Sequence, residues 1–205
     1  MKPFTLLLAA ITLLSVSCKN SANDKAPDEG TVKGEIYKSA EIGWSIEIPK
    51  GWDIISRDQL ESNDAKGKSA LEKQAGKPVD ISDLKHLISF QKDRFNMLAS
   101  TSEPFVGDSL VYDSANHALD QLLYSTFVSQ GVSADTASGT VMVDGLKFNA
   151  FYTTINSPTG AVLLKQVLYS RLINGYDFGV NINYTNDSCK KIMTAAFMNS
   201  KFDKK

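Results

Sequence analysis

The most regular part of this sequence is residues 174–184, which read NGYDFGVNINY. From Tyr176 to Tyr184 every second residue is large and apolar, and the residues between them are Asp, Gly or Asn. A period of two is typical of a β-strand that buries one face. Asn174-Gly175 supplies the positive φ angles of a type I′ turn, so an antiparallel neighbour should precede this strand directly. The stretch predicts an antiparallel sheet with a core against one face.

Three more strands are expected upstream, over 138–144, 146–156 and 162–173, because Asp144-Gly145 and the turn at 157–160 separate them. Together with 176–184 they predict an up-and-down meander. The strand over 162–173 has apolar residues on both faces, which is typical of a strand covered on two sides. We therefore expect helices over both faces of a single antiparallel sheet, at least in part.

The remaining elements follow from the same patterns of periodicity and turn residues. Two strands are expected to form a hairpin around residues 92–94. Gly67 is a candidate break in the first helix, because a glycine inside a helix destabilises it by about 1 kcal/mol relative to alanine. A polar tail with Phe202 is expected to be frayed. The expected strands are Trp44–Ile48, Leu84–Gln91 and Phe95–Ser100. The expected helices are Arg57–Gln74, one capped by Asp113 or Ser114 and ended by Gly131, and one opened by Asn186-Asp187-Ser188 with Ile192, Met193, Ala196 and Phe197 on one stripe.

The N-terminus has the layout of a secretory signal peptide over residues 1–17. Lys2 precedes an apolar run from Phe4 to Leu14, which is too short to span a bilayer as a helix. Cys18 follows Ser15-Val16-Ser17 directly, which predicts a bacterial lipoprotein whose mature chain begins at Cys18 and carries lipid on its thiol. The match to a lipobox is imperfect, because Leu14 lies four residues before the cysteine rather than three. An ordinary cleavage site remains the alternative, because Ser15-Val16-Ser17 is also a small-x-small sequence.

A polar segment over residues 18–34 separates the signal from the folded part. It is almost free of apolar side chains, so it is expected to be a flexible tether. One domain over residues 35–202 should follow, and the lipid should hold it to a membrane of the cell envelope. Whether it faces the periplasm or the cell surface stays open.

Composition disfavours several functional classes. The 22 basic and 23 acidic residues nearly balance, so no strong field attracts nucleic acid. His86, His117 and Cys189 lie in three separate segments without the spacing of zinc ligands, and no metal or other cofactor is expected. Cys189 is expected to be a half-buried or idle thiol.

Residues 43–52, GWSIEIPKGW, resemble the first strand and the P-x-G-W corner of proteins with the Mog1/PsbP-like fold. The later order of a long helix, a meander and a closing helix is similar to small bacterial lipoproteins of that superfamily, so the resemblance covers residues 36–202. It implies an α/β/α sandwich around an antiparallel sheet, within the α+β class. It implies no chemistry, because known members act mainly as binding or assembly subunits, and no residue here matches their partner-binding motifs.

Catalytic signatures are weak. His86 and His117 have no Gly-x-Ser-x-Gly nucleophile beside them in sequence, and structural or solvated histidines are the favoured interpretation. Gly67-Lys68-Ser69 lacks the earlier glycine of a phosphate-binding loop. The scattered carboxylates Asp80, Asp83, Asp108 and Asp113 do not form a calcium loop.

Aromatic residues and one loop are the remaining candidates for a binding surface. Phe148 and Tyr152 should share one face of their strand and Phe151 the other, and most aromatics are expected in the core. The segment Ser100–Asp108 either docks something through Phe105-Val106 or tucks one aromatic side chain under the sheet edge.

Two functional hypotheses follow. The first is a lipid-anchored, non-enzymatic binding or assembly accessory of the cell envelope, with an unknown envelope protein as its partner. The second is a small-ligand carrier or an enzyme whose site is built from scattered polar residues on the sheet, and a pocket with convergent polar groups would favour it.

Overall fold

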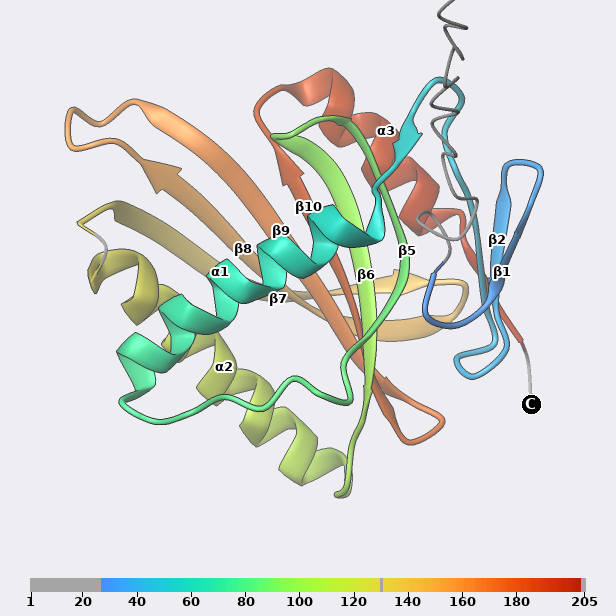
Figure 1. The fold of residues 1–205 in the computed structure, drawn as a ribbon, viewed down its shortest axis with the longest axis horizontal. Helices are drawn as coiled ribbons and strands as arrows, with labels where there is room; N and C mark the ends of the chain where they lie inside the picture. Colours follow the sequence, from blue (N-terminus) through green and yellow to red (C-terminus); the bar gives the residue numbers. More distant parts are fainter. Residues whose placement is uncertain (1–26, 130, 204–205) are drawn as a thin grey trace, which may run out of the picture.

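The computed structural model describes residues 27–129 and 131–203. These residues form an α+β structure of antiparallel sheets and helices (Figure 1). The strands are β1 (Thr31–Lys33), β2 (Ile36–Ser39), β3 (Trp44–Glu47), β4 (Asp53–Ile54), β5 (Lys85–Asp93), β6 (Asn96–Pro104), β7 (Ser133–Val143), β8 (Leu146–Asn156), β9 (Val162–Ile173), β10 (Tyr176–Tyr184) and β11 (Lys201–Phe202), and the helices are α1 (Arg57–Ala75), α2 (Ser109–Ser129) and α3 (Asp187–Met198).

The large sheet has the strand order β4-β5-β6-β10-β9-β8-β7, and all its pairs are antiparallel. The meander predicted from the sequence is confirmed as β7 to β10. Asp144 has a φ of 48° and Asn174 a φ of 54°, as the expected turns require. The order of the strands β7 to β10 therefore follows from the residues in the turns between them.

The expectation of a single sheet was wrong, because a second sheet has the order β1-β2-β3-β11. The N-terminal hairpin does not join the large sheet at an edge. It lies across the core instead, where the Trp44 ring packs 4.9 Å from the Phe178 ring, centroid to centroid. β11 completes the small sheet by pairing with β3, and Phe202 is buried. The chain is therefore not frayed at Phe202, because this side chain closes the core.

The main core lies between one face of the large sheet and a layer made of α3 and the small sheet. Phe178, Val180 and Ile182 of β10 are fully buried on this face, as their alternation predicted. Phe197 of α3 stacks on Tyr169 with 4.8 Å between ring centroids. Aromatic packing of this kind adds to the stabilisation from burial.

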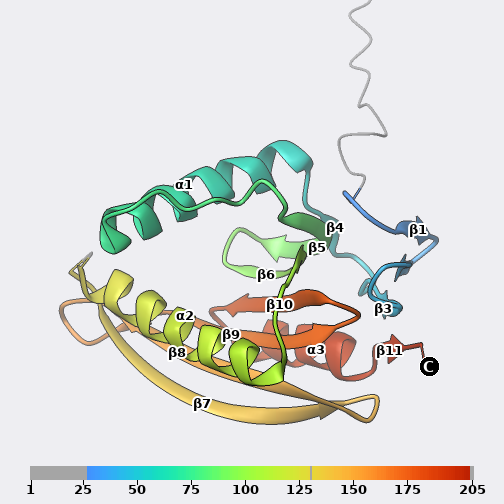
Figure 2. The ribbon, with the colours of Figure 1, turned by 90° about the horizontal axis from the view of Figure 1, so that it is seen from below.

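The other face of the large sheet is covered by α1 and α2, which lie side by side (Figures 1 and 2). α1 runs without interruption through Gly67, so the candidate break does not occur. α2 begins at Ser109 rather than near Asp113, because Asp108 caps it by accepting hydrogen bonds from the N–H groups of Leu110 and Val111, both at 3.0 Å. Helices thus cover both faces, as expected in part.

The folded region begins before residue 35, within the segment expected to be a tether. The N–H of Asp28 donates to the carbonyl of His86 at 2.8 Å, and β1 pairs with β2. The predicted signal peptide and Cys18 lie outside the described residues. No helix in the described part of the chain has the length and apolar character needed to cross a membrane.

Candidate functional site

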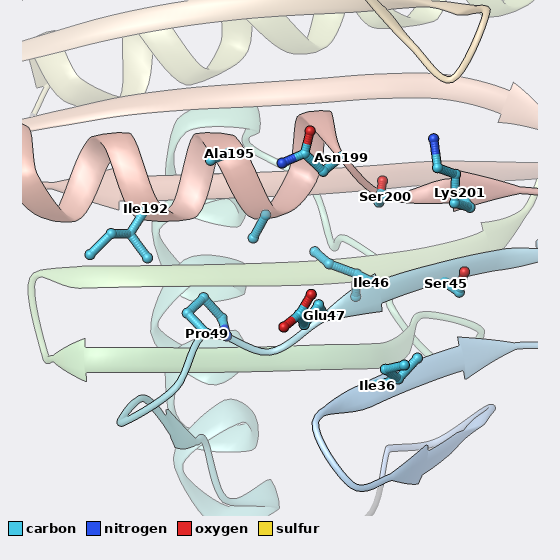
Figure 3. Close-up of a pocket in the computed structure, with 11 residues that line it drawn as sticks. Ile36, Ser45, Ile46, Glu47, Pro49, Ile192, Ala195, Asn199, Ser200 and Lys201 are labelled. Atoms are coloured by element: carbon cyan, nitrogen blue, oxygen red, sulfur yellow. The ribbon is translucent and has the colours of Figure 1, made fainter.

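A surface groove of about 460 Å³ runs between β3 and α3 (Figure 3). We call it the α3 groove. Its lining is contributed by β2, β3, α3 and β11, elements that lie far apart in the sequence. The lining residues are Ile36, Ser45, Ile46, Glu47, Pro49, Ile192, Ala195, Ala196, Asn199, Ser200 and Lys201.

Strand geometry explains the β3 side of the α3 groove. The N–H of Ile48 bonds the carbonyl of Glu35 at 2.7 Å on the β2 side, so the N–H and C=O of Glu47 are directed to the other side. On that side β11 pairs only with Trp44 and Ser45. Beyond Ser45 the neighbour of β3 is α3, so the groove combines main-chain polar groups with apolar side chains.

Two aliphatic side chains stand on opposite sides of the α3 groove. Ile36 of β2 is 47% exposed and Ile192 of α3 is 42% exposed. Ile192, expected on one stripe of α3 with Met193, Ala196 and Phe197, is therefore not part of the buried face of that helix. Met193 and Phe197 alone reach the core fully, because they are spaced i, i+4, whereas Ile192 is rotated about 100° away from Met193.

The polar groups of the α3 groove suit binding better than catalysis. Lys201 donates to Asp144 at 3.0 Å, and the hydroxyl of Ser200 donates to the carbonyl of Phe197 at 2.6 Å. Glu47 is an exposed carboxylate on the outer face of β3. No histidine or cysteine is among the lining residues, so the groove holds no serine–histidine or cysteine–histidine pair.

The two histidines and the thiol of Cys189 lie on three different elements, so they do not form one site. Nε2 of His86 on β5 lies 2.6 Å from Asp64 of α1, which ties that helix to the sheet. His117 is exposed on α2 beside Gln121. Cys189 is half-buried in α3, as expected. Among the described residues, no group of three or more His, Cys, Asp or Glu side chains could hold a metal ion.

Carboxylates with shifted pKa values lie under α2, away from the α3 groove. Burial raises the pKa of Asp177, although the hydrogen bond from the Tyr112 hydroxyl at 2.7 Å opposes this shift. Burial and the neighbouring Asp177 also raise the pKa of Glu103, its cross-strand partner. Burial raises the pKa of Tyr112 as well, and the negative charge of Asp177 adds to that shift. These groups hold α2 to the sheet.

The other sequence candidates occupy structural positions. Gly67-Lys68-Ser69 lies within α1 and forms no loop. Residues 100–104 belong to β6, and Phe105 packs edge-on against Tyr112 at 5.2 Å between centroids, while Val106 is 96% exposed. The loop therefore tucks its aromatic residue under α2.

Most of the aromatic side chains are in the core, as expected. Phe95, Tyr124 and Tyr152 are the exposed exceptions, at 45%, 45% and 39%. Phe148 and Phe151 are buried on opposite faces of β8. Tyr152 shares its face with Phe148.

The sequence alone does not predict the α3 groove, because its walls meet only through tertiary packing. Ile36 and Ile192 are separated by most of the domain, and each one by itself fits an amphipathic pattern. The one available signal was that Ile192 and Met193 are adjacent on a short helix and cannot both point directly into the core.

No protein-family model matches the chain, and no curated protein matches it in sequence. Among solved structures, the chain is similar to the solution structure of cyanobacterial PsbP (CyanoP) from Synechocystis sp. PCC 6803. The TM-score is 0.55 at 12% sequence identity, and the match covers 85% of this chain and 98% of that chain. The PsbP-like fold implied by the resemblance of residues 43–52 is thereby confirmed.

Proposed function

We propose that this protein is a non-enzymatic binding accessory of the bacterial cell envelope, anchored to a membrane by lipid on Cys18. The layout of residues 1–18 supports the anchor, since an apolar run too short to span a bilayer ends directly before a cysteine. A lipid and a short tether would leave the domain free to meet envelope proteins near the membrane. The PsbP-like fold is compatible with this role but does not by itself assign it.

The binding site in this proposal is the α3 groove, and its occupant is an extended segment of an envelope protein that carries an aliphatic side chain. The observation that carries the proposal is the pair Ile36 and Ile192, exposed on opposite sides of one groove. Single exposed apolar residues are normal, but two that face a common groove give a segment something to insert between. The main-chain groups of Glu47 directed toward the groove suit an extended backbone.

A photocrosslinking amino acid at Ile192 tests the proposal in cells that keep the chain in its natural membrane. The expected result is a covalent adduct with one other envelope protein, mapped to an extended segment with an aliphatic residue. Met142 of β7 is the matched control position, because it is 61% exposed and lies outside the groove. We expect at least about tenfold less adduct from Met142.

A substitution at Ile36, on the opposite side of the groove, tests whether the adduct from position 192 depends on the groove. Ile36→Asp places a charge where the aliphatic side chain is expected to insert, and it should abolish the adduct from position 192. Equal adduct yields at positions 192 and 142 would contradict the proposal. An adduct that joins two copies of this chain would contradict it too, since the occupant would then be a second copy.

A further inference from the structure

A second cavity lies on the opposite face of the large sheet from the α3 groove. It has a volume of about 520 Å³ and is enclosed by α1, the segment 81–84 and strands β5, β6 and β10. We call it the α1 crevice. Its size is within the roughly 300–1,000 Å³ range of small-molecule pockets.

The α1 helix covers this face without filling it. Only Leu60 is buried among the 19 residues of the helix. Gly67 faces the crevice from the middle of α1, and a Cβ atom added there would meet no atom within 4 Å. The hydrogen bond of 2.6 Å between Asp64 and His86 fastens α1 to the sheet edge beside this space.

The sheet side of the crevice is polar. Asn181 and Asn183 alternate with the buried core residues of β10, so both amides project to the α1 side. The Oδ1 atoms of both amides are buried and have no hydrogen-bond donor among the described residues. A buried acceptor without a donor costs free energy, and a bound N–H or O–H group would remove that cost.

The remaining lining includes aliphatic and cationic groups, together with the carboxylate of Asp64, which is paired with His86. Leu71 of α1 and Leu84 before β5 line the helix side of the crevice, and Leu168 of β9 lines the sheet side. Lys68 and Arg94 also line it and supply positive charge. Among the lining residues there is no Phe, Tyr or Trp, and the imidazole of His86 is held by its hydrogen bond to Asp64, so the crevice offers little surface for stacking a base or a sugar.

We propose that the α1 crevice binds a short aliphatic peptide with free ends, of the size of a dipeptide or tripeptide. Its ammonium group would donate to the amide oxygens of Asn181 and Asn183. Its carboxylate would pair with Lys68 or Arg94, since charged groups form the stronger hydrogen bonds. Its side chains would pack against the leucines of the crevice.

Isothermal titration calorimetry of the full mature chain in detergent with leucyl-leucine tests the proposal. We expect saturable binding with a dissociation constant below about 1 mM. N-acetyl-leucyl-leucinamide, which lacks both charged ends, should bind at least about tenfold more weakly. This site is separate from the α3 groove, so the result is independent of the proposed function.

Two substitutions at Gly67 separate filling of the crevice from changes in the helix. Gly67→Leu places a side chain in the open space and should weaken leucyl-leucine binding by at least about tenfold. Gly67→Ala is the matched control, because it also removes a helix glycine but adds only a methyl group, and it should keep the affinity within about twofold. Asn181→Leu removes one acceptor and should weaken binding even if Gly67→Leu does not fold.

Three outcomes would overturn the proposal. One is the absence of saturable heat up to about 10 mM leucyl-leucine. Another is wild-type affinity in both Gly67→Leu and Asn181→Leu. The third is a liganded structure in which only ordered water contacts the two asparagine amides.

Discussion

At the scale of single residues, Asp177 explains how a polar group is tolerated beneath α2. Its carboxylate accepts a hydrogen bond from Tyr112, and Tyr112 in turn packs against Phe105. Asn116 strengthens the same attachment by accepting a hydrogen bond of 2.7 Å from Ser170. A helix with few buried side chains is thus fixed by specific hydrogen bonds rather than by a wide apolar face.

Asp177 should make the stability of the domain fall as the pH rises. Burial raises its pKa above the ordinary value of 3.8, so the folded state holds a proton that the unfolded state has already lost. Its contribution to the free energy of unfolding is greatest below about pH 4 and declines as the pH rises through the raised pKa. Asp177→Asn keeps an acceptor for Tyr112 and cannot ionise, so this decline should disappear.

Urea denaturation at pH 4 and pH 7 measures the effect. We expect Asp177→Asn to be more stable relative to the wild type at pH 7 than at pH 4. Glu103→Gln should show a change of the same sign, because the pKa of Glu103 is raised as well. A variant that loses stability relative to the wild type as the pH rises would contradict this assignment.

At the scale of elements, the segment before β2 belongs to the fold. The Glu29 carboxylate accepts hydrogen bonds from the N–H of Ala40 at 2.7 Å, the N–H of Glu41 at 3.2 Å and the hydroxyl of Ser39. The hydroxyl of Tyr37 donates to the carbonyl of Glu29 at 2.7 Å. The segment therefore closes the turn between β2 and β3 from outside.

Glu29→Ala should destabilise the domain by about 1–3 kcal/mol, because two main-chain N–H groups and a buried hydroxyl lose their acceptor. Urea denaturation followed by circular dichroism measures the loss. Glu35→Ala is the matched control on the exposed turn before β2, and it should change stability by less than about 0.5 kcal/mol. Equal stability of the two variants would contradict the stabilising role of the Glu29 carboxylate.

The elements that could be predicted from the sequence are those fixed by neighbouring residues. Asp144-Gly145 and Asn174-Gly175 determine the turns of the meander, and the alternation in β10 determines which face is buried. The pairing of β11 with β3 could not be predicted in this way, because Phe202 and Trp44 are far apart in sequence and only the core joins them. Both cavities depend on such distant contacts.

The start of α2 illustrates a competition between local signals. Asp108, Asp113 and Ser114 are all acceptable capping residues, and the sequence pattern favoured the later two. Asp108 is the cap because starting at Ser109 brings Tyr112 onto the helix face that reaches Asp177. A tertiary hydrogen bond thus decided between equivalent local choices.

At the scale of the whole molecule, the large sheet separates two binding surfaces of different character. The α3 groove is open and apolar at its sides, whereas the α1 crevice has an amide-lined floor. The described chain starts beside β5, where the N–H of Asp28 donates to the carbonyl of His86. Anchoring through Cys18 would hold both surfaces close to the membrane.

The intact mass of the mature protein purified from bacterial membranes tests the anchored-accessory proposal most directly. We predict a chain that begins at Cys18 and carries the mass increment of a diacyl or triacyl lipid, and we predict that Cys18→Ala loses both the increment and the membrane association. An unmodified chain that begins at Cys18 and is recovered in the soluble fraction would contradict the proposal.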